Sequence, residues 1–218
     1  MIKINLTVIT AIHDRLDGLM NVFKSLENQT YIYDIEHILI DDCSTEISYE
    51  KLEELCKNNP HRHFVRLGFR SHFYGCFARD IGTILAFCYI HHSKRDIDNE
   101  WVTYLDTDNE WKPNHLESMV KALEENPQLI MIGADMEMVG ANDKDWRQIR
   151  PCKIKQGYCD IGSFMYRTSL FRKYGYWFAH PHRKQKYDFE LIKKIVEGEY
   201  GKVFFTNQAT FLMSYRKQ

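Results

Sequence analysis

Residues 101–109 read Trp-Val-Thr-Tyr-Leu-Asp-Thr-Asp-Asn, an apolar stretch that ends in two aspartates two positions apart. The first five residues predict a strand, because aromatic and β-branched side chains favour extended backbone. Alternate residues of a strand share a face, so Asp106 and Asp108 can converge on one point. Two carboxylates there suit Mg²⁺ or Mn²⁺, which keep open positions for phosphate oxygens. Asp and Asn also form turns, so the pattern alone leaves an ordinary strand end open.

Strand-like and helix-like segments alternate on both sides of this stretch. The predicted strands are 6–10, 35–40, 63–67, 101–105, 129–139, 158–166, 202–205 and 210–215. The predicted helices are 14–28, 49–57, 77–90, 114–125, 169–174 and 187–197, with a polar loop over 140–156. Such alternation indicates an α/β fold with an open, mostly parallel sheet and helices on both faces. At 218 residues without a Pro/Gly-rich linker, the chain is expected to form a single domain.

Two of the predicted helices carry more detailed expectations. Asp14 is placed as the N-cap of helix 14–28, because a short acceptor side chain there satisfies free N–H groups. Helical spacing predicts the inner face of helix 77–90 as the following residues: Phe77, Ile81, Ile84, Leu85 and Cys88.

Composition narrows the function classes. The chain is 44% hydrophobic with a net charge of −1, so nothing points to nucleic-acid binding. Six cysteines without a C-x-x-C pair indicate a reduced, cytoplasmic protein. The sequence contains no run of about 18 apolar residues, so we expect no transmembrane segment. Basic residues gather within 167–186, which permits peripheral contact with a membrane surface or anionic substrate, although a solvated face is the alternative.

Polar residues follow three of the predicted parallel strands. These strand ends are Thr10-Ala11-Ile12-His13, Asp41-Asp42-Cys43-Ser44 and Asp106-Thr107-Asp108. Ligands of open α/β sheets bind beyond the carboxyl ends of the strands. We therefore expect these three segments to form one ligand site.

Five segments, in order and at plausible spacing, carry a resemblance that spans nearly the whole chain. Residues 7–15 are similar to a V-I-x-P-T-Y-N-R opening, 38–45 to V-V-D-D-G-S-T, and 76–82 to an A-R-N-x-G segment. Residues 104–109 contain a D-x-D motif, and 186–191 lie where an E-D-x-x-L motif is expected. With these motifs the chain resembles the family 2 glycosyltransferases of the GT-A fold, which is Rossmann-like.

The resemblance implies a metal-dependent transfer, with inversion, of a sugar from a nucleoside diphosphate sugar to an acceptor hydroxyl. It favours a UDP-sugar donor and a role in polysaccharide or glycan synthesis, with a glycan or lipid-linked saccharide as acceptor. The resemblance also implies that residues up to about 110 bind the nucleotide and that about 111–218 bind the acceptor.

The site residues follow from the same motifs. The nucleotide is assigned to Thr10, Ala11, His13, Asp42, Arg79, Asp106 and Thr107. A carboxylate such as Asp42 can accept the imide N–H of uracil. The Mn²⁺ or Mg²⁺ ion is assigned to Asp106 and Asp108, with His180 or His182 as an additional candidate. Asp188 is the expected general base, and Asp160 is the next candidate for that role.

Departures from the motifs keep two other functions open. Ala11 and Ile12 replace the Pro and Tyr of the opening motif, and Tyr187 replaces the Glu beside the expected base. The first alternative is a sugar-nucleotide nucleotidyltransferase, which usually opens with a glycine-rich phosphate loop; residues 9–16 contain no glycine. The second is a non-catalytic module that binds a nucleotide sugar without turnover.

Overall fold

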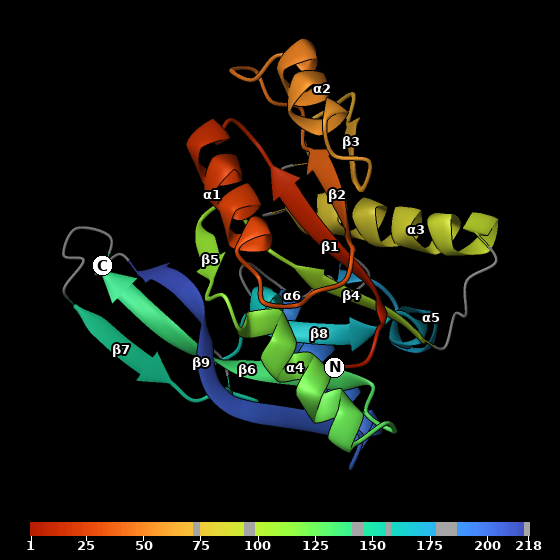
Figure 1. Ribbon diagram of the computed structural model, residues 1–218, viewed down its shortest axis with the longest axis vertical. Helices are drawn as coiled ribbons and strands as arrows, with labels where there is room; N and C mark the ends of the chain where they lie inside the picture. The colour runs from red at the N-terminus through yellow and green to blue at the C-terminus, as the bar shows by residue number, and fades with distance from the viewer. Residues whose placement is uncertain (72–74, 94–98, 141–145, 156–157, 178–186, 216–218) are drawn as a thin grey trace.

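A single nine-stranded sheet runs through the computed structural model, which describes residues 1–71, 75–93, 99–140, 146–155, 158–177 and 187–215 (Figure 1). The strands are β1 (Asn5–Ile12), β2 (Ile35–Asp41), β3 (Arg62–Arg66), β4 (Glu100–Tyr104), β5 (Asn109–Trp111), β6 (Met131–Gly140), β7 (Arg147–Arg150), β8 (Phe164–Arg167) and β9 (Val203–Tyr215). The helices are α1 (Leu16–Glu27), α2 (Tyr49–Lys57), α3 (Cys76–Ser93), α4 (His115–Glu125), α5 (Ser169–Tyr174) and α6 (Tyr187–Gly198). The strand order is β3-β2-β1-β4-β8-β6-β9-β5, and β7 pairs with β6.

The four strands β3-β2-β1-β4 are parallel and form the part of the sheet that positions the polar strand ends. Apolar, β-branched runs predict these strands within one or two residues at most ends, and buried parallel strands have this composition. Ile12 at the end of β1 pairs with Asp41 at the end of β2. Ile9 pairs with Tyr104, the last residue of β4. The three strand ends therefore open onto the same edge of the sheet.

Helix α3 packs on this sheet through small side chains. A Cβ on Gly82 would lie 2.5 Å from Cγ2 of Ile9, so the helix backbone approaches β1 closely. Ala78 is buried, whereas Ile84 and Cys88 are exposed. The predicted inner face was therefore wrong at Ile84 and Cys88, because α3 turns Thr83, Ala86 and Phe87 inward instead. The three other residues predicted to face inward are half-buried: Phe77, Ile81 and Leu85.

Antiparallel pairing begins at β8, which runs opposite to both β4 and β6. Here the structure corrects several predictions. The expected loop 140–156 contains β7, which pairs with β6. Of the expected strand 158–166, residues 161–163 form a 3₁₀ helix, and the strand begins only at Phe164. The two predicted closing strands form one strand, β9, which also pairs with β5, a short strand that was not predicted.

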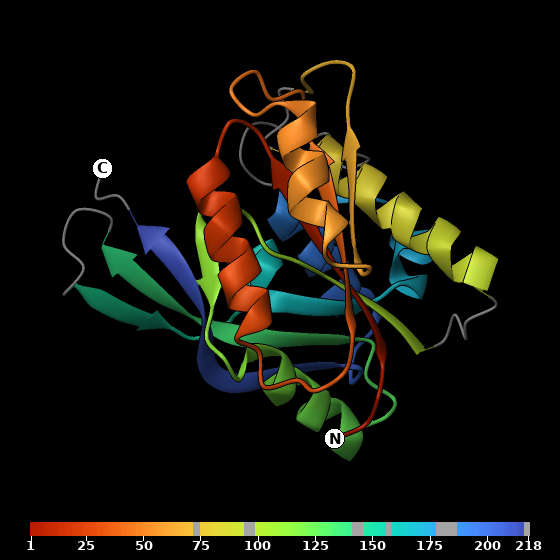
Figure 2. The same cartoon turned by 45° about the horizontal axis from the view of Figure 1, so that its top comes forward.

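Helices cover both faces of the sheet, as predicted (Figures 1 and 2). One hydrophobic core contains Leu19 of α1, Leu52 of α2 and Met119 of α4. A second core joins α3, α5 and α6 to the other face, through residues such as Phe87 and Ile192. Within the described residues, none of the helices has the length and apolar character that crossing a membrane requires.

Candidate functional site

A cavity of about 460 Å³ lies where β1, β2 and β4 end. We call it the strand-end cavity. Its lining consists of Ala11, Ile12, His13, Arg15, Asp42, Arg70, Gly75, Arg79, Asp106, Thr107 and Asp108. The sheet thus brings together residues that lie up to about 100 positions apart in sequence. Three carboxylates and three guanidinium groups share this wall, which suits a ligand that carries both phosphates and hydrogen-bonding groups.

Asp106 is held by an arginine. Its carboxylate forms an ion pair with the Arg79 guanidinium, and Arg79 Nε donates to Asp106 Oδ1 at 3.2 Å. The two side chains are 16% and 9% exposed, so little solvent screens the pair. Arg79 lies in the first turn of α3, and its backbone N–H bonds to the Gly75 carbonyl. Helix α3 therefore fixes the position of the first aspartate of the D-x-D motif.

Asp108 lies in a more open position. Its carboxylate Oδ2 is 3.3 Å from Nη1 of Arg15, and the side chains are 56% and 50% exposed. The described residues contain no group of three or more His, Cys, Asp or Glu side chains that could hold a metal ion. Among the described residues, Asp106 and Asp108 would thus be the ligands of a divalent ion at this motif, which leaves coordination positions for phosphate and water. Mg²⁺ and Mn²⁺ commonly bind in this way, so the residues fit such an ion.

Asp42 faces the cavity with its carboxylate already ordered. Ser71 donates its backbone N–H to Oδ1 at 2.8 Å and its hydroxyl to Oδ2 at 2.9 Å. His13 lies beside it, with Nδ1 3.0 Å from the Asp42 carbonyl oxygen. These bonds fix the side chain, and each carboxylate oxygen keeps a second lone pair for a ligand donor.

Two neighbouring aspartates are structural. Asp41 accepts the Ser44 N–H at 2.9 Å and pairs with Arg66, so it stabilises the turn after β2. Asp14, at φ 50°, accepts the N–H groups of Thr45 and Glu46, and the bond from Glu46 helps to lower the pKa of Asp14. The predicted N-cap role of Asp14 was wrong, because its carboxylate accepts hydrogen bonds from the loop after β2 instead of from α1. Helix α1 instead has Arg15 as N-cap, without a side-chain capping bond.

Thr10 does not reach the cavity. Its side chain is fully buried, and its hydroxyl donates to the Leu105 carbonyl at 2.8 Å and contacts His37 Nε2 at 3.0 Å. The Thr10 hydroxyl therefore bonds inside the sheet, and the assignment of Thr10 to the nucleotide stays a prediction. The other described residues assigned to the nucleotide or to the metal all line the strand-end cavity.

The side chain of the predicted base, Asp188, is not among those that the structure describes. Asp188 lies in the first turn of α6, but its side chain is outside the described part of the structure, as are His180 and His182. Asp160 is described: its carboxylate accepts the Gly162 N–H at 2.9 Å and so caps the 3₁₀ helix. The assignment of Asp188 as base thus stays a prediction.

The cavity contains two arginines that the motifs did not assign to the nucleotide or to the metal. Arg15 follows the first loop, and Arg70 precedes the serine that bonds to Asp42. Arg15 matches the arginine that ends the opening motif, and no local pattern distinguishes Arg70 from an ordinary surface arginine. Only the pairing of distant strands places them beside the D-x-D motif.

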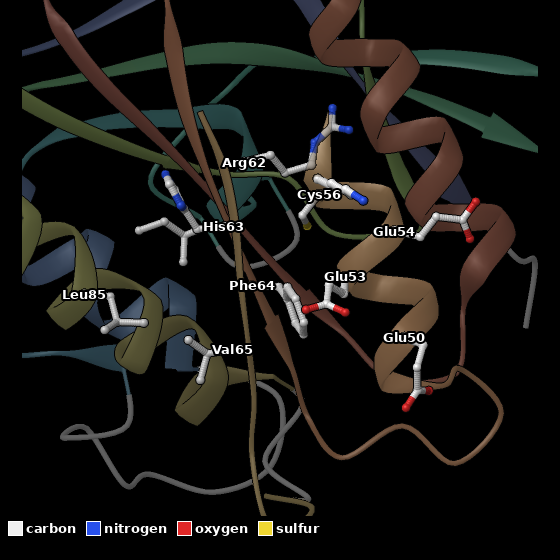
Figure 3. A pocket seen from close by; sticks show the side chains of 11 residues that line it. Glu50, Glu53, Glu54, Cys56, Arg62, His63, Phe64, Val65 and Leu85 are labelled. Carbon is white, nitrogen blue, oxygen red and sulfur yellow. The ribbon is translucent and has the colours of Figure 1, made fainter. Parts of the chain in front are cut away.

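A larger hollow lies elsewhere in the described structure. It measures about 830 Å³ and lies along strand β3 at the edge of the sheet. Figure 3 shows Glu50, Glu53 and Glu54 from α2 on one side of β3 and Leu85 from α3 on the other. It contains none of the strand-end residues. We therefore place the candidate site at the smaller cavity, where the acidic and basic groups converge.

The chain is similar to a known protein family in sequence and to solved structures in fold. The model of a family described as Glycosyl transferase family 2 matches residues 7–79 and 88–195. No curated protein sequence matches the chain. Among solved structures, S. aureus TarS 1-349 superposes with a TM-score of 0.69 and 17% identity, covering 96% of this chain and 60% of that one.

Two other solved structures are similar. The mannosyltransferase PcManGT from Pyrobaculum calidifontis, in complex with GDP-Man and Mn²⁺, has a TM-score of 0.71 and 14% identity, over 100% of this chain and 59% of that one. GalNAc-T7 with UDP, GalNAc and Mn²⁺ has a TM-score of 0.70 and 19% identity, over 99% of this chain and 44% of that one. At these identities the likeness shows the GT-A fold. The chain spans about 60% of the length of TarS 1-349.

Proposed function

This chain belongs to glycosyl transferase family 2, and from that premise we propose that it transfers a sugar from a nucleoside diphosphate sugar to an acceptor hydroxyl. One observation carries the proposal: residues from three distant strand ends, among them three aspartates, line a single cavity together with three arginines. A nucleotidyltransferase would share the carboxylates, but the family match favours glycosyl transfer.

The donor is assigned to the strand-end cavity, with uridine diphosphate as its nucleotide. Asp42 would accept the imide N–H of uracil with the lone pairs that Ser71 leaves available. Ala11, His13 and Thr107 form the surrounding wall, together with Arg79 and Asp106. The structure of TarS 1-349 in complex with UDP supports a uridine donor by analogy of fold only.

The divalent ion is assigned to the D-x-D motif. Asp108 would be the direct ligand, because it is exposed and its one ion pair is weakly held, whereas Asp106 is largely engaged by Arg79. When bound, Mn²⁺ or Mg²⁺ supplies positive charge for the leaving diphosphate. Arg79 would keep the Asp106 carboxylate oriented toward the ion and the ribose.

Sugar transfer is assigned as a direct displacement with inversion. The acceptor oxygen forms a bond to the anomeric carbon while the bond from that carbon to the diphosphate oxygen breaks. The acceptor proton passes to the carboxylate of Asp188, with Asp160 as the alternative base. A general base of this kind contributes roughly 10²–10⁴-fold to the rate.

The remaining assignments are proposals as well. Residues up to about 110 would bind the donor, and about 111–218 would bind a glycan or lipid-linked saccharide during polysaccharide or glycan synthesis. All six cysteines are free thiols, which supports a reducing, cytoplasmic location.

A ligand panel tests the function directly. We expect a nucleoside diphosphate sugar, most of all a UDP-sugar, to raise the melting temperature in the presence of Mn²⁺. Sugar release into water should then require the metal and stop when a chelator is added. Binding without any turnover, with acceptors or with water, would support the non-catalytic alternative. Absence of binding to every nucleotide tested would contradict the proposal.

A further inference from the structure

Arg15 occupies a position between two cavities that meet at the D-x-D motif. It lines the strand-end cavity together with Arg70 and Arg79. It also lines a second cavity of about 530 Å³, the α1-side cavity, which contains Asp17 and Glu46. Thr107 and Asp108 border both cavities, so the guanidinium can face either one by rotation of its own side chain.

Among the described residues, the Arg15 side chain forms one ion pair, with Nη1 3.3 Å from Oδ2 of Asp108. The backbone of Arg15 has a separate task, since its carbonyl oxygen accepts the Leu19 N–H as helix α1 begins. The side chain is thus dispensable for the helix. Its half-exposed ion pair has a small net free energy, and a stronger ligand for Asp108 would displace it.

We propose that Arg15 is a diphosphate-binding residue that exchanges partners during donor binding. Without ligand, its guanidinium neutralises Asp108. When a divalent ion binds Asp108, like-charge repulsion drives the guanidinium away, and the donor diphosphate receives it in the strand-end cavity. A guanidinium binds phosphate oxygens in a bidentate fork, which favours this second position. This inference rests on the proposed function and adds a residue that couples metal binding to donor binding.

The exchange predicts effects of opposite sign when the charge is removed. In Arg15→Gln, Mn²⁺ alone should bind roughly two- to fivefold more tightly, because no cation competes for Asp108. UDP in the presence of saturating Mn²⁺ should bind about fivefold or more weakly, because one charged hydrogen bond to phosphate is lost. A purely structural role of Arg15 would weaken both ligands or neither.

Isothermal titration calorimetry of Mn²⁺ and of UDP measures both constants without turnover. Lys51→Gln is the matched control for the loss of one positive charge, because Lys51 of α2 is 42% exposed and pairs with Glu54 at 3.0 Å, and it lines none of the cavities that Asp108 borders. Arg15→Lys should restore part of the UDP affinity. Unchanged or weaker Mn²⁺ binding in Arg15→Gln, or unchanged UDP binding, would overturn the exchange. The proposed function would still stand in that case, as long as the wild-type protein binds Mn²⁺ and UDP. If the wild-type protein bound neither ligand, both proposals would fall.

Discussion

The carboxylate of Asp106, at the end of β4, is paired with the guanidinium of Arg79, in the first turn of α3. The two residues are separated by 27 positions in sequence and are both mostly buried. Through this pair, a helix that packs on the parallel sheet holds the motif to which we assign the metal and the donor.

We predict that Arg79→Met lowers kcat/KM by about 10- to 100-fold, because residues that orient a metal ligand contribute effects of this size. It should also lower the free energy of unfolding by about 1–3 kcal/mol, since the Asp106 carboxylate then lacks its counter-ion. Initial rates and urea unfolding measure the two effects.

Arg66→Met is the matched control for Arg79→Met. Arg66 pairs with the buried carboxylate of Asp41, which also belongs to a strand end but does not line the strand-end cavity. A comparable loss of stability with near-normal kcat/KM is expected. Equal losses of kcat/KM in both variants would show that Arg79 acts only through folding.

Gly18 provides a second test, because its lack of a side chain makes room for the D-x-D motif. A Cβ at this position in α1 would lie 2.1 Å from the backbone oxygen of Thr107. Gly18→Ala should therefore displace residues 106–108 and weaken Mn²⁺ and UDP binding by about tenfold. Alanine favours helices, so a gain of helix propensity of about 1 kcal/mol opposes the effect on stability.

Gly68→Ala is the control for Gly18→Ala, because a Cβ on Gly68 meets no atom within 4 Å. Its ligand affinities should match those of the wild-type protein. If Gly18→Ala also bound both ligands normally, the close approach of α1 would have no role in positioning the motif.

The proposed base leads to a third prediction. Asp188→Asn should reduce kcat by roughly 10²–10⁴-fold, because an amide cannot accept the acceptor proton. UDP affinity should stay within about twofold of wild type. Glu190→Gln, two positions along α6, serves as control. Near-normal turnover of Asp188→Asn would move the role to Asp160, with Asp160→Asn as the deciding measurement.

The parallel part of the fold was predictable because its signals are local. Buried strands such as β1 and β2 carry continuous apolar, β-branched residues, and α2 has clear helical spacing. The strands β5 and β7 carry no such pattern and form because β9 and β6 offer pairing edges. Distant chain segments thus decide the antiparallel part, and a local sequence window does not contain that information.

The candidate site shows the same division. Motifs identified Asp42, Asp106 and Asp108, because carboxylates after parallel strands meet at one edge of a sheet. Motifs did not show that the Thr10 hydroxyl bonds inside the sheet, which depends on His37 of the neighbouring strand. They also could not pair Arg15 with Asp108, since this contact depends on how α1 packs beside β5.

Two buried histidines predict how stability depends on pH. Burial lowers the pKa of His37 and of His115 from 6.5 to about 3. Above pH 6.5 both rings are neutral in the folded and unfolded chain, so they add no pH dependence. Below pH 6.5 the unfolded chain takes up protons that the folded chain refuses until about pH 3, so stability falls as the pH falls.

Each histidine should thus lower the free energy of unfolding by about 1.4 kcal/mol for each pH unit below 6.5, or by about 2 kcal/mol between pH 6.5 and 5. Urea unfolding at several pH values in this range measures the slope. His115 bonds to Thr210 through Nδ1 at 2.8 Å and stacks on Trp111, so His115→Gln lowers stability at every pH. The informative quantity is the slope of the free energy of unfolding against pH, which should lose the contribution of one of the two histidines. Parallel curves for the two proteins would mean that His115 takes up its proton in the folded state as readily as in the unfolded state.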